Sequence, residues 1–190
     1  MTINSPKIPA TGKRAIFLDR DGVLNDVVDR GEDFFVQGKK VRWTAPFNYN
    51  EFRFKPGIVE VLEALGERGW LRILVTNQPD ITYGTMPPEE HEKIMAEVKN
   101  LPLDDIYVCI HGRNDGCLCK KPLPGMLLTA AEKWGIHLPS SYMVGDTKSD
   151  LEAARAAGTR SIIISDGRNN DLASDWRAEE LAAILDIIGE

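Results

Sequence analysis

A short apolar run that ends in two acids constrains this chain more than any other feature. Residues 15–18, Ala-Ile-Phe-Leu, are continuously apolar, which predicts a strand that is buried on both faces. Asp19 and Asp21 follow at once, and Gly22 comes directly after them. Carboxylates beside a core are costly unless a cation or hydrogen bonds hold them. We therefore interpret Asp19 and Asp21 as a reactive pair placed around a metal ion.

Four further apolar runs, separated by helical patterns, indicate the fold class. Strands are predicted at residues 71–75, 106–110, 142–144 and 161–164. Helices are predicted from Pro56-Gly57 to Gly66 or Gly69, at 87–99, at 127–134, from a Ser149/Glu152 capping box to Gly158, and at about 178–188. This alternation is typical of an α/β fold with a Rossmann-like, doubly wound parallel sheet. Ligands of such sheets lie beyond the carboxyl ends of the strands.

Length and composition predict one domain over residues 1–190. The net charge is −6 and no basic tract is present, which disfavours a general nucleic-acid binder. No apolar run reaches membrane-spanning length and no apolar signal segment starts the chain, so we expect a cytoplasmic protein. Residues 1–13 contain Pro, Ser and Thr, and we expect them to form a loose arm.

Residues 26–55 are unusually aromatic and are predicted to form a small flap. They contain five of the six phenylalanines of the chain. Residues 35–41 predict a hairpin that turns near Gly38, and the Phe47-x-Tyr49 and Phe52-x-Phe54 patterns have the period of strands. The flap would lie over the strand ends, where it would act as a substrate lid or form a satellite core or dimer contact.

Four potential metal ligands fall within residues 109–119. They are Cys109, His111, Cys117 and Cys119, and they include every cysteine of the chain. A Cys₃His set at this spacing suits a closed tetrahedral zinc site. Zinc would brace the loop that presents the next two lysines, and it would not take part in the chemistry because no coordination position is left open. The alternative is three buried thiols beside an unrelated histidine.

Polar residues at other strand ends complete a set that suits phosphoryl transfer. Asp19 would attack phosphorus to give an aspartyl-phosphate. Asp19, Asp146 and the chain at Asp21 would hold Mg²⁺, which prefers a few oxygen ligands together with phosphate. Thr76 would bind the phosphoryl oxygens, and Lys121 would neutralise charge from the other side. Asp21 would serve as general acid and then as general base.

Three neighbouring residues leave two interpretations open. In one interpretation, Asp150 supports the metal or pairs with Lys121. In the other, it is an acid in the first turn of a helix, where the helix dipole favours it. Asn77 either binds substrate or caps the end of its strand. Lys120 is either a second phosphate contact or a solvated charge.

In this order, these motifs resemble those of the haloacid-dehalogenase-like (HAD) phosphatases. Residues 19–23, Asp-Arg-Asp-Gly-Val, are similar to the first motif of that family. Thr76 stands for the second motif, Lys121 for the third, and residues 145–150, Gly-Asp-x-x-x-Asp, for the fourth. The resemblance spans residues 15–165 and implies a magnesium-dependent phosphatase without a large cap domain.

A narrower resemblance points to the zinc-loop branch that contains heptose-bisphosphate and histidinol-phosphate phosphatases. This resemblance rests on residues 18–25, 75–78 and 119–122. It implies that the substrate is contacted by Arg20, Asn25, Asn77 and Lys120. The chain departs from this branch at residues 79–84, Pro-Asp-Ile-Thr-Tyr-Gly, where the branch has Ser-Gly-Ile-Ala-Arg-Gly. The length of residues 26–55 is a second departure, and both lie where they would reshape the substrate pocket.

The expected function is therefore hydrolysis of a small phosphorylated metabolite, with a heptose-type sugar phosphate as the first candidate. One alternative is a histidinol-phosphate-like or nucleic-acid 3′-end phosphatase, although no basic groove is indicated. Another is a zinc-braced binding domain that has lost catalysis. The presence of Asp19, Lys121 and Asp146 argues against that last alternative.

Overall fold

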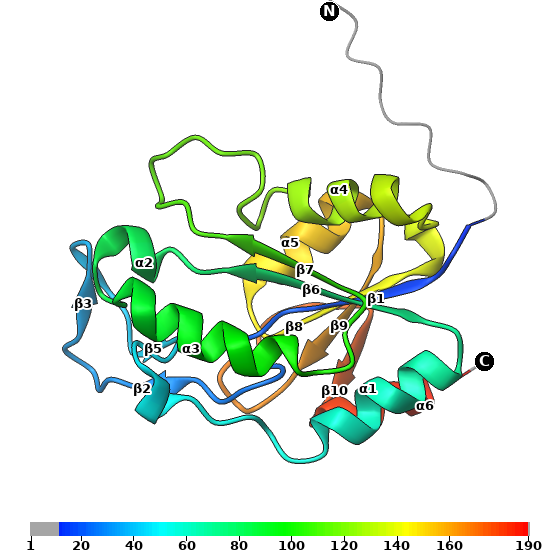
Figure 1. Ribbon diagram of the computed structural model, residues 1–190, viewed down its shortest axis with the longest axis horizontal. Helices are drawn as coiled ribbons and strands as arrows, with labels where there is room; N and C mark the ends of the chain where they lie inside the picture. The colour runs from blue at the N-terminus through cyan, green and yellow to red at the C-terminus, as the bar shows by residue number, and fades with distance from the viewer. Residues whose placement is uncertain (1–11, 190) are drawn as a thin grey trace, which may run out of the picture.

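In the computed structural model, which describes residues 12–189, β1 (Ala15–Leu18) lies inside a six-stranded sheet (Figure 1). The strand order is β10-β9-β8-β1-β6-β7, and every neighbouring pair is parallel. The other strands are β6 (Leu71–Asn77), β7 (Asp105–Cys109), β8 (Tyr142–Gly145), β9 (Arg160–Ile164) and β10 (Trp176–Ala178). The predicted α/β fold with a parallel sheet is confirmed.

Helices cover both faces of the sheet and create two apolar cores (Figure 1). On one face lie α1 (Ile58–Glu67), α3 (Pro88–Lys99) and the short α6 (Ile184–Ile187). On the other lie α4 (Gly125–Trp134) and α5 (Lys148–Ala157). In β1, Ile16 and Leu18 belong to the first core and Ala15 and Phe17 to the second. This alternation explains why the strand is apolar at every position.

Two segments at the ends of the described chain differ from the sequence predictions. The helix predicted at about 178–188 begins later than expected, because residues 176–178 form edge strand β10 and are followed by a 3₁₀ turn, Leu181–Ala183, before α6. Leu181 and Ile184 still pack into the core, which produced the helical spacing. At the other end, Lys13 is already tied to Gly135 and His137 by backbone bonds. Residues 1–11 of the predicted arm lie outside the described residues.

The cap of α5 is shifted relative to the prediction. Thr147 has an extended backbone and begins the helix, and its reciprocal partner is Asp150, so the Ser149/Glu152 capping box is wrong. Ser149 lies inside the first turn. The shift places the Asp150 carboxylate at the carboxyl end of β8, where the chain leaves the sheet.

Residues 26–55 form the predicted flap, with the hairpin where it was expected. β3 (Phe35–Val36) pairs with β4 (Lys39–Lys40), and the turn between them has positive φ at Gln37 and Gly38, as a tight hairpin requires. A second antiparallel pair joins β2 (Val28–Asp29) to β5 (Trp43–Thr44). The predicted strands at 47–54 are wrong, because Tyr49–Glu51 is a 3₁₀ turn capped by Asn48.

The flap begins and ends at the same place on the domain. The Asp26 amide donates to the Arg53 carbonyl at 3.0 Å, and the Lys55 amide donates to the Leu24 carbonyl at 2.9 Å. Flap residues lie beside the carboxyl ends of the central strands, where they share a cavity with Asp19. No helix within residues 12–189 combines the length and the apolar character needed to cross a membrane.

Candidate active site

Four side chains from three loops meet beyond the carboxyl end of β1. Asp19 follows β1, Asp146 follows β8, Asp150 lies in the first turn of α5, and Lys121 precedes α4. The Lys121 Nζ atom lies 2.9 Å from Asp19 Oδ1 and 2.6 Å from Asp150 Oδ1. Carboxylate oxygens of the three acids lie within 4.8 Å of one another. The sheet order, with β8 next to β1, makes this meeting possible.

The cluster holds more negative charge than its lysine can neutralise. Burial and nearby acids raise the pKa of Asp19 to about 7, although the Lys121 ammonium opposes that rise. Burial and the Asp19 and Asp150 carboxylates raise the pKa of Asp146 to about 8. Burial alone would lower the pKa of Lys121, but Asp150 and Asp19 raise it above its usual value. Additional positive charge would therefore stabilise the site.

The donor set fits a divalent cation such as Mg²⁺. Asp146 Oδ1 is buried and has no hydrogen-bond partner among the described residues. Both carboxylate oxygens of Asp150 already accept hydrogen bonds, one from Lys121 and the other from the amide and hydroxyl of Thr147. Asp19 and Asp146 are therefore the side chains best placed to hold the ion. Gly22, at φ +85°, leaves the room, since a Cβ there would lie 2.1 Å from Asp146 Oδ2.

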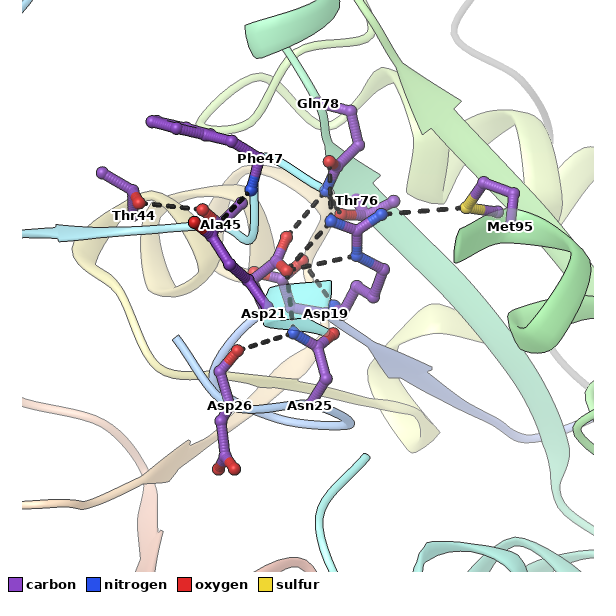
Figure 2. A network of polar contacts seen from close by, with 12 residues as sticks. Asp19, Asp21, Asn25, Asp26, Thr44, Ala45, Phe47, Thr76, Gln78 and Met95 are labelled. Carbon is purple, nitrogen blue, oxygen red and sulfur yellow. Dashed lines mark hydrogen bonds and ion pairs between the residues drawn. The ribbon is translucent and has the colours of Figure 1, made fainter. Parts of the chain in front are cut away.

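A buried network fixes the carboxylate of Asp21 (Figure 2). Asp21 Oδ1 accepts from Arg20 Nη2 at 3.0 Å and from Asn25 Nδ2 at 3.0 Å. Asp21 Oδ2 accepts from Gln78 Nε2 at 2.7 Å, and the same nitrogen lies 2.9 Å from Thr76 Oγ1. Asp21 still lines the cavity, so its carboxylate is held in one orientation at the edge of the site.

The network bears on three residues singled out from the sequence. Arg20 and Asn25 are fully buried and do not line the cavity, so neither contacts substrate in this arrangement. Arg20 instead donates to Asp21, to Gln78 and to the sulfur of Met95. The Asp21 side chain is outside the acid cluster, so any role at the metal would fall to its backbone.

The remaining predicted residues make structural hydrogen bonds, and two of them also line the cavity. Thr76 is fully buried and accepts from Gln78. Asn77 lines the cavity, but its amide exchanges two hydrogen bonds with the Lys121 backbone, at 2.9 and 3.0 Å. Lys120 also lines the cavity, and its ammonium donates to the His111 carbonyl. Asn77 therefore fixes the position of Lys121 relative to β6.

Two residues near the site were not identified from sequence as functional. Gln78 connects Asp21, Thr76 and Arg20, and its only signal was that it follows Thr76-Asn77 at a strand end. Arg168, in the loop after β9, places Nη2 3.2 Å from Asp146 Oδ2. Its guanidinium also lies 5.0 Å from the Trp43 ring of the flap. A loop arginine without periodicity gives no sequence signal.

The four predicted zinc ligands converge in one place. Sulfur and nitrogen atoms of Cys109, His111, Cys117 and Cys119 lie within 4.8 Å of one another. Cys119 Sγ lies 3.2 Å from Cys109 Sγ and 3.3 Å from His111 Nδ1. Burial raises the pKa of the Cys109 thiol to about 12, and a hydrogen bond with Cys119 adds to that rise. The spacing is compatible with a single tetrahedral ion.

Asp19, Asp21, Lys121 and Asp146 line a cavity of about 610 Å³. The flap supplies one wall, which includes Val36, Lys39 and Trp43. Other lining residues, including Tyr83 and Arg113, come from the segment after β6 and from the zinc loop. The flap therefore faces the site as a lid would, while Phe34 and Phe47 pack together in it as a small separate cluster.

The Gln78 network gives a first prediction. Gln78→Leu should lower kcat by about ten- to a hundredfold with a smaller change in KM, because Asp21 loses an orienting donor and Arg20 loses an acceptor. Steady-state kinetics would measure this. Ser141→Ala is the matched control, because it breaks one buried and one partly buried hydrogen bond at the opposite end of the sheet. It should lower the melting temperature and leave kcat unchanged; equal kcat losses in both variants would contradict the role of Gln78.

Comparison with known proteins decides the family. The HAD-hydrolase-like family model matches residues 118–189. The D-glycero-beta-D-manno-heptose-1,7-bisphosphate 7-phosphatase of Yersinia pestis is 35% identical over 188 residues, covering 88% of this chain and 91% of that protein. The chain belongs to the HAD-like phosphatases. The equally named phosphatase of Pseudomonas putida is 34% identical and covers 82% of this chain and 84% of its own length.

A solved HAD phosphatase agrees in three dimensions. The crystal structure of D,D-heptose 1,7-bisphosphate phosphatase from B. bronchiseptica, complexed with magnesium and phosphate, superposes with a TM-score of 0.75 at 29% identity. The match covers 92% of this chain and 97% of that one. The resemblance to HAD phosphatases inferred from the sequence motifs is therefore confirmed, and the protein is a phosphatase.

Proposed function

We propose that this HAD phosphatase is a Mg²⁺-dependent phosphomonoesterase that acts through an aspartyl-phosphate on a small, heptose-type sugar phosphate. The main support for the proposal is the contact of Lys121 Nζ with Asp19 Oδ1 at 2.9 Å, beside Asp146 Oδ1, which has no hydrogen-bond partner within residues 12–189. The names of the relatives support the substrate class. The magnesium and phosphate complex of the B. bronchiseptica phosphatase supports the choice of metal.

In the first step, a carboxylate oxygen of Asp19 attacks phosphorus and the bond from phosphorus to the alcohol oxygen breaks. Asp21 transfers a proton to that alcohol oxygen, which leaves as a neutral hydroxyl. Arg20, Asn25 and Gln78 keep the Asp21 carboxylate in place for this transfer. The phosphoryl group then remains on Asp19 as a mixed anhydride.

In the second step, Asp21 removes a proton from water, and the water oxygen attacks phosphorus. The bond between phosphorus and Asp19 breaks, which regenerates the carboxylate and releases inorganic phosphate. Lys121 balances charge on the phosphoryl oxygens in both steps, and its contact with Asp150 keeps it in position. Bound Mg²⁺ would supply matching positive charge from the side of Asp19 and Asp146.

The cavity suits a leaving group of sugar size that carries further negative charge. A volume of about 610 Å³ is within the range of small-molecule sites. Lys39, Arg113, Lys120 and Arg168 line it in addition to Lys121. These cations come from the flap, the zinc loop and the loop after β9, so a substrate would contact all three segments.

A panel of phosphomonoesters tests the proposal. We expect the protein to release phosphate from heptose and hexose phosphates when Mg²⁺ is present. Release should stop when EDTA removes the metal, and it should recover when Mg²⁺ is restored. The panel includes histidinol phosphate and a 3′-phosphorylated oligonucleotide. A preference for either over every sugar phosphate would overturn the substrate class, and full activity in EDTA would overturn the metal dependence.

A further inference from the structure

The cavity contains one acid that the proposed mechanism does not use. Its lining includes Asp19, Asp21 and Asp146, which belong to the phosphoryl-transfer machinery, and a fourth acid, Asp80. Several lining residues are cationic, as expected for a site that binds phosphate esters. A carboxylate in such a wall repels the anions that the site attracts, so its presence calls for a specific role.

Asp80 is held in place at the start of the short helix α2 (Asp80–Tyr83). The Thr85 hydroxyl donates to Asp80 Oδ1 at 2.8 Å, and the Thr85 and Met86 amides donate to the Asp80 carbonyl. Helix α2 directly follows β6, so Asp80 lies close to the phosphoryl-transfer residues in the chain as well as in space. The orientation of its carboxyl group is therefore defined before a ligand arrives.

The surroundings of Asp80 place it on the leaving-group side of the cavity. Burial raises the pKa of its carboxyl group, the Asp21 carboxylate adds to that rise, and the Lys120 ammonium opposes it. Asp80, Asp21 and Lys120 all line the cavity, and Asp80 comes two residues after Gln78, whose side-chain amide donates to Asp21 Oδ2 at 2.7 Å. Since Asp21 must reach the ester oxygen, Asp80 lies where the first atoms of the alcohol would be.

A purely structural role leaves part of this arrangement unexplained. An acid in the first turn is favoured by the dipole of a long helix, but α2 has only four residues. The Thr85 hydroxyl binds one carboxyl oxygen. A partly buried carboxylate beside another acid is unfavourable unless further donors reach it. A sugar hydroxyl is a donor of the required kind, and a carboxylate can accept two of them.

We propose, on the basis of the proposed function, that Asp80 is a specificity-determining residue of the substrate site. It accepts a hydrogen bond from a hydroxymethyl group of the alcohol close to the phosphate ester, and it rejects alcohols that carry a carboxylate in place of that group. The substrate class is thereby narrowed to polyol and sugar phosphates, with phosphorylated hydroxy acids excluded. A site that pairs a buried polar group with substrate discriminates more strongly than an apolar one.

Two matched substrate pairs test this inference. Glycerol 3-phosphate and 3-phosphoglycerate differ by a hydroxymethyl group in place of a carboxylate close to the ester. Sorbitol 6-phosphate and 6-phosphogluconate differ in the same way at the far end. For the wild type we expect kcat/KM to favour the polyol by at least about tenfold in the short pair, and by less in the long pair.

The variant Asp80→Asn keeps the shape of the side chain and removes its charge. We expect the preference within the short pair to fall by about tenfold, because the polyol loses an acceptor while the hydroxy acid loses a repulsion. Thr85→Val is the structural control, since it removes the hydroxyl bond and leaves the charge, and it should retain most of the preference. Glu89→Gln removes an exposed acid of α3 that does not line the cavity, and it should change nothing.

The outcomes separate the inference from the proposed function. If the wild type hydrolyses no sugar or polyol phosphate, the proposed function fails. If the wild type is active and Asp80→Asn keeps the wild-type preference, only the role of Asp80 fails. A Thr85→Val variant that loses the preference as fully as Asp80→Asn would assign Asp80 to holding α2 and would also overturn the inference. Circular dichroism and melting curves confirm that each variant is folded.

Discussion

Asp19→Asn will abolish hydrolysis of phosphomonoesters, with kcat lowered by at least about a thousandfold. The amide cannot form the aspartyl-phosphate, and the neighbouring acids cannot substitute for it. Asp150 is bound to Lys121 and Thr147, and Asp21 is held by its own donors. Quenched-flow assays with labelled substrate, followed by mass spectrometry of the protein, would measure both turnover and the covalent intermediate.

The same substitution should leave the fold intact. Burial beside other acids raises the pKa of Asp19, so its charged form costs stability near neutral pH when no metal is bound. A neutral amide removes that cost, and the melting temperature without metal should not fall below that of the wild type. Asp171→Asn, at an exposed position, is the matched control and should keep full activity. Turnover by Asp19→Asn, or a labelled residue other than Asp19, would contradict the assignment of the nucleophile.

Loss of the zinc ion expected at the Cys₃His cluster should have the second largest effect, and this effect is on stability. We expect about one zinc per chain, and the free energy of unfolding should fall by several kcal/mol when Cys119→Ser removes a ligand. The buried Cys109 belongs to the core packed by α4, so an uncoordinated cluster disturbs that core directly. Elemental analysis and denaturant unfolding would measure the two quantities.

Loss of zinc should also lower the activity, and the reason is geometric. Lys120 and Lys121 follow the last ligand directly, so disorder in the loop moves the ammonium away from Asp19. His137→Asn changes a histidine outside the cluster and should retain both zinc and activity. Protein purified without zinc that melts at the same temperature as zinc-loaded protein would show that the loop is braced by packing alone.

Much of the fold and part of the site could be predicted because the relevant patterns are local. The apolar run at 15–18 predicted β1, and the rule that ligands lie beyond parallel strand ends brought Asp19 and Asp146 together. The spacing of the cysteines predicted their convergence. Edge strand β10 was missed, because Trp176 and Arg177 are exposed and three residues give no usable period.

The errors at the site have a different origin. Arg20 stands between two functional acids, and only packing shows that it turns inward to Met95 and Gln78. Asp80 begins the four-residue helix α2 and Arg168 lies in a loop, so their approach to the cavity depends on tertiary structure that no periodic pattern encodes. Sequence identified the residues of the proposed chemistry more readily than those that orient them or line the rest of the cavity.

The entry and exit of the flap, joined by the bonds from Asp26 to Arg53 and from Lys55 to Leu24, have an evolutionary consequence. An insertion whose two ends meet can be lengthened, shortened or exchanged without moving β1 or α1. Selectivity can thus diversify in a segment that is topologically independent of the reaction centre. A chimaera that receives residues 26–55 of another family member would inherit a different choice of alcohol while keeping the same phosphate chemistry.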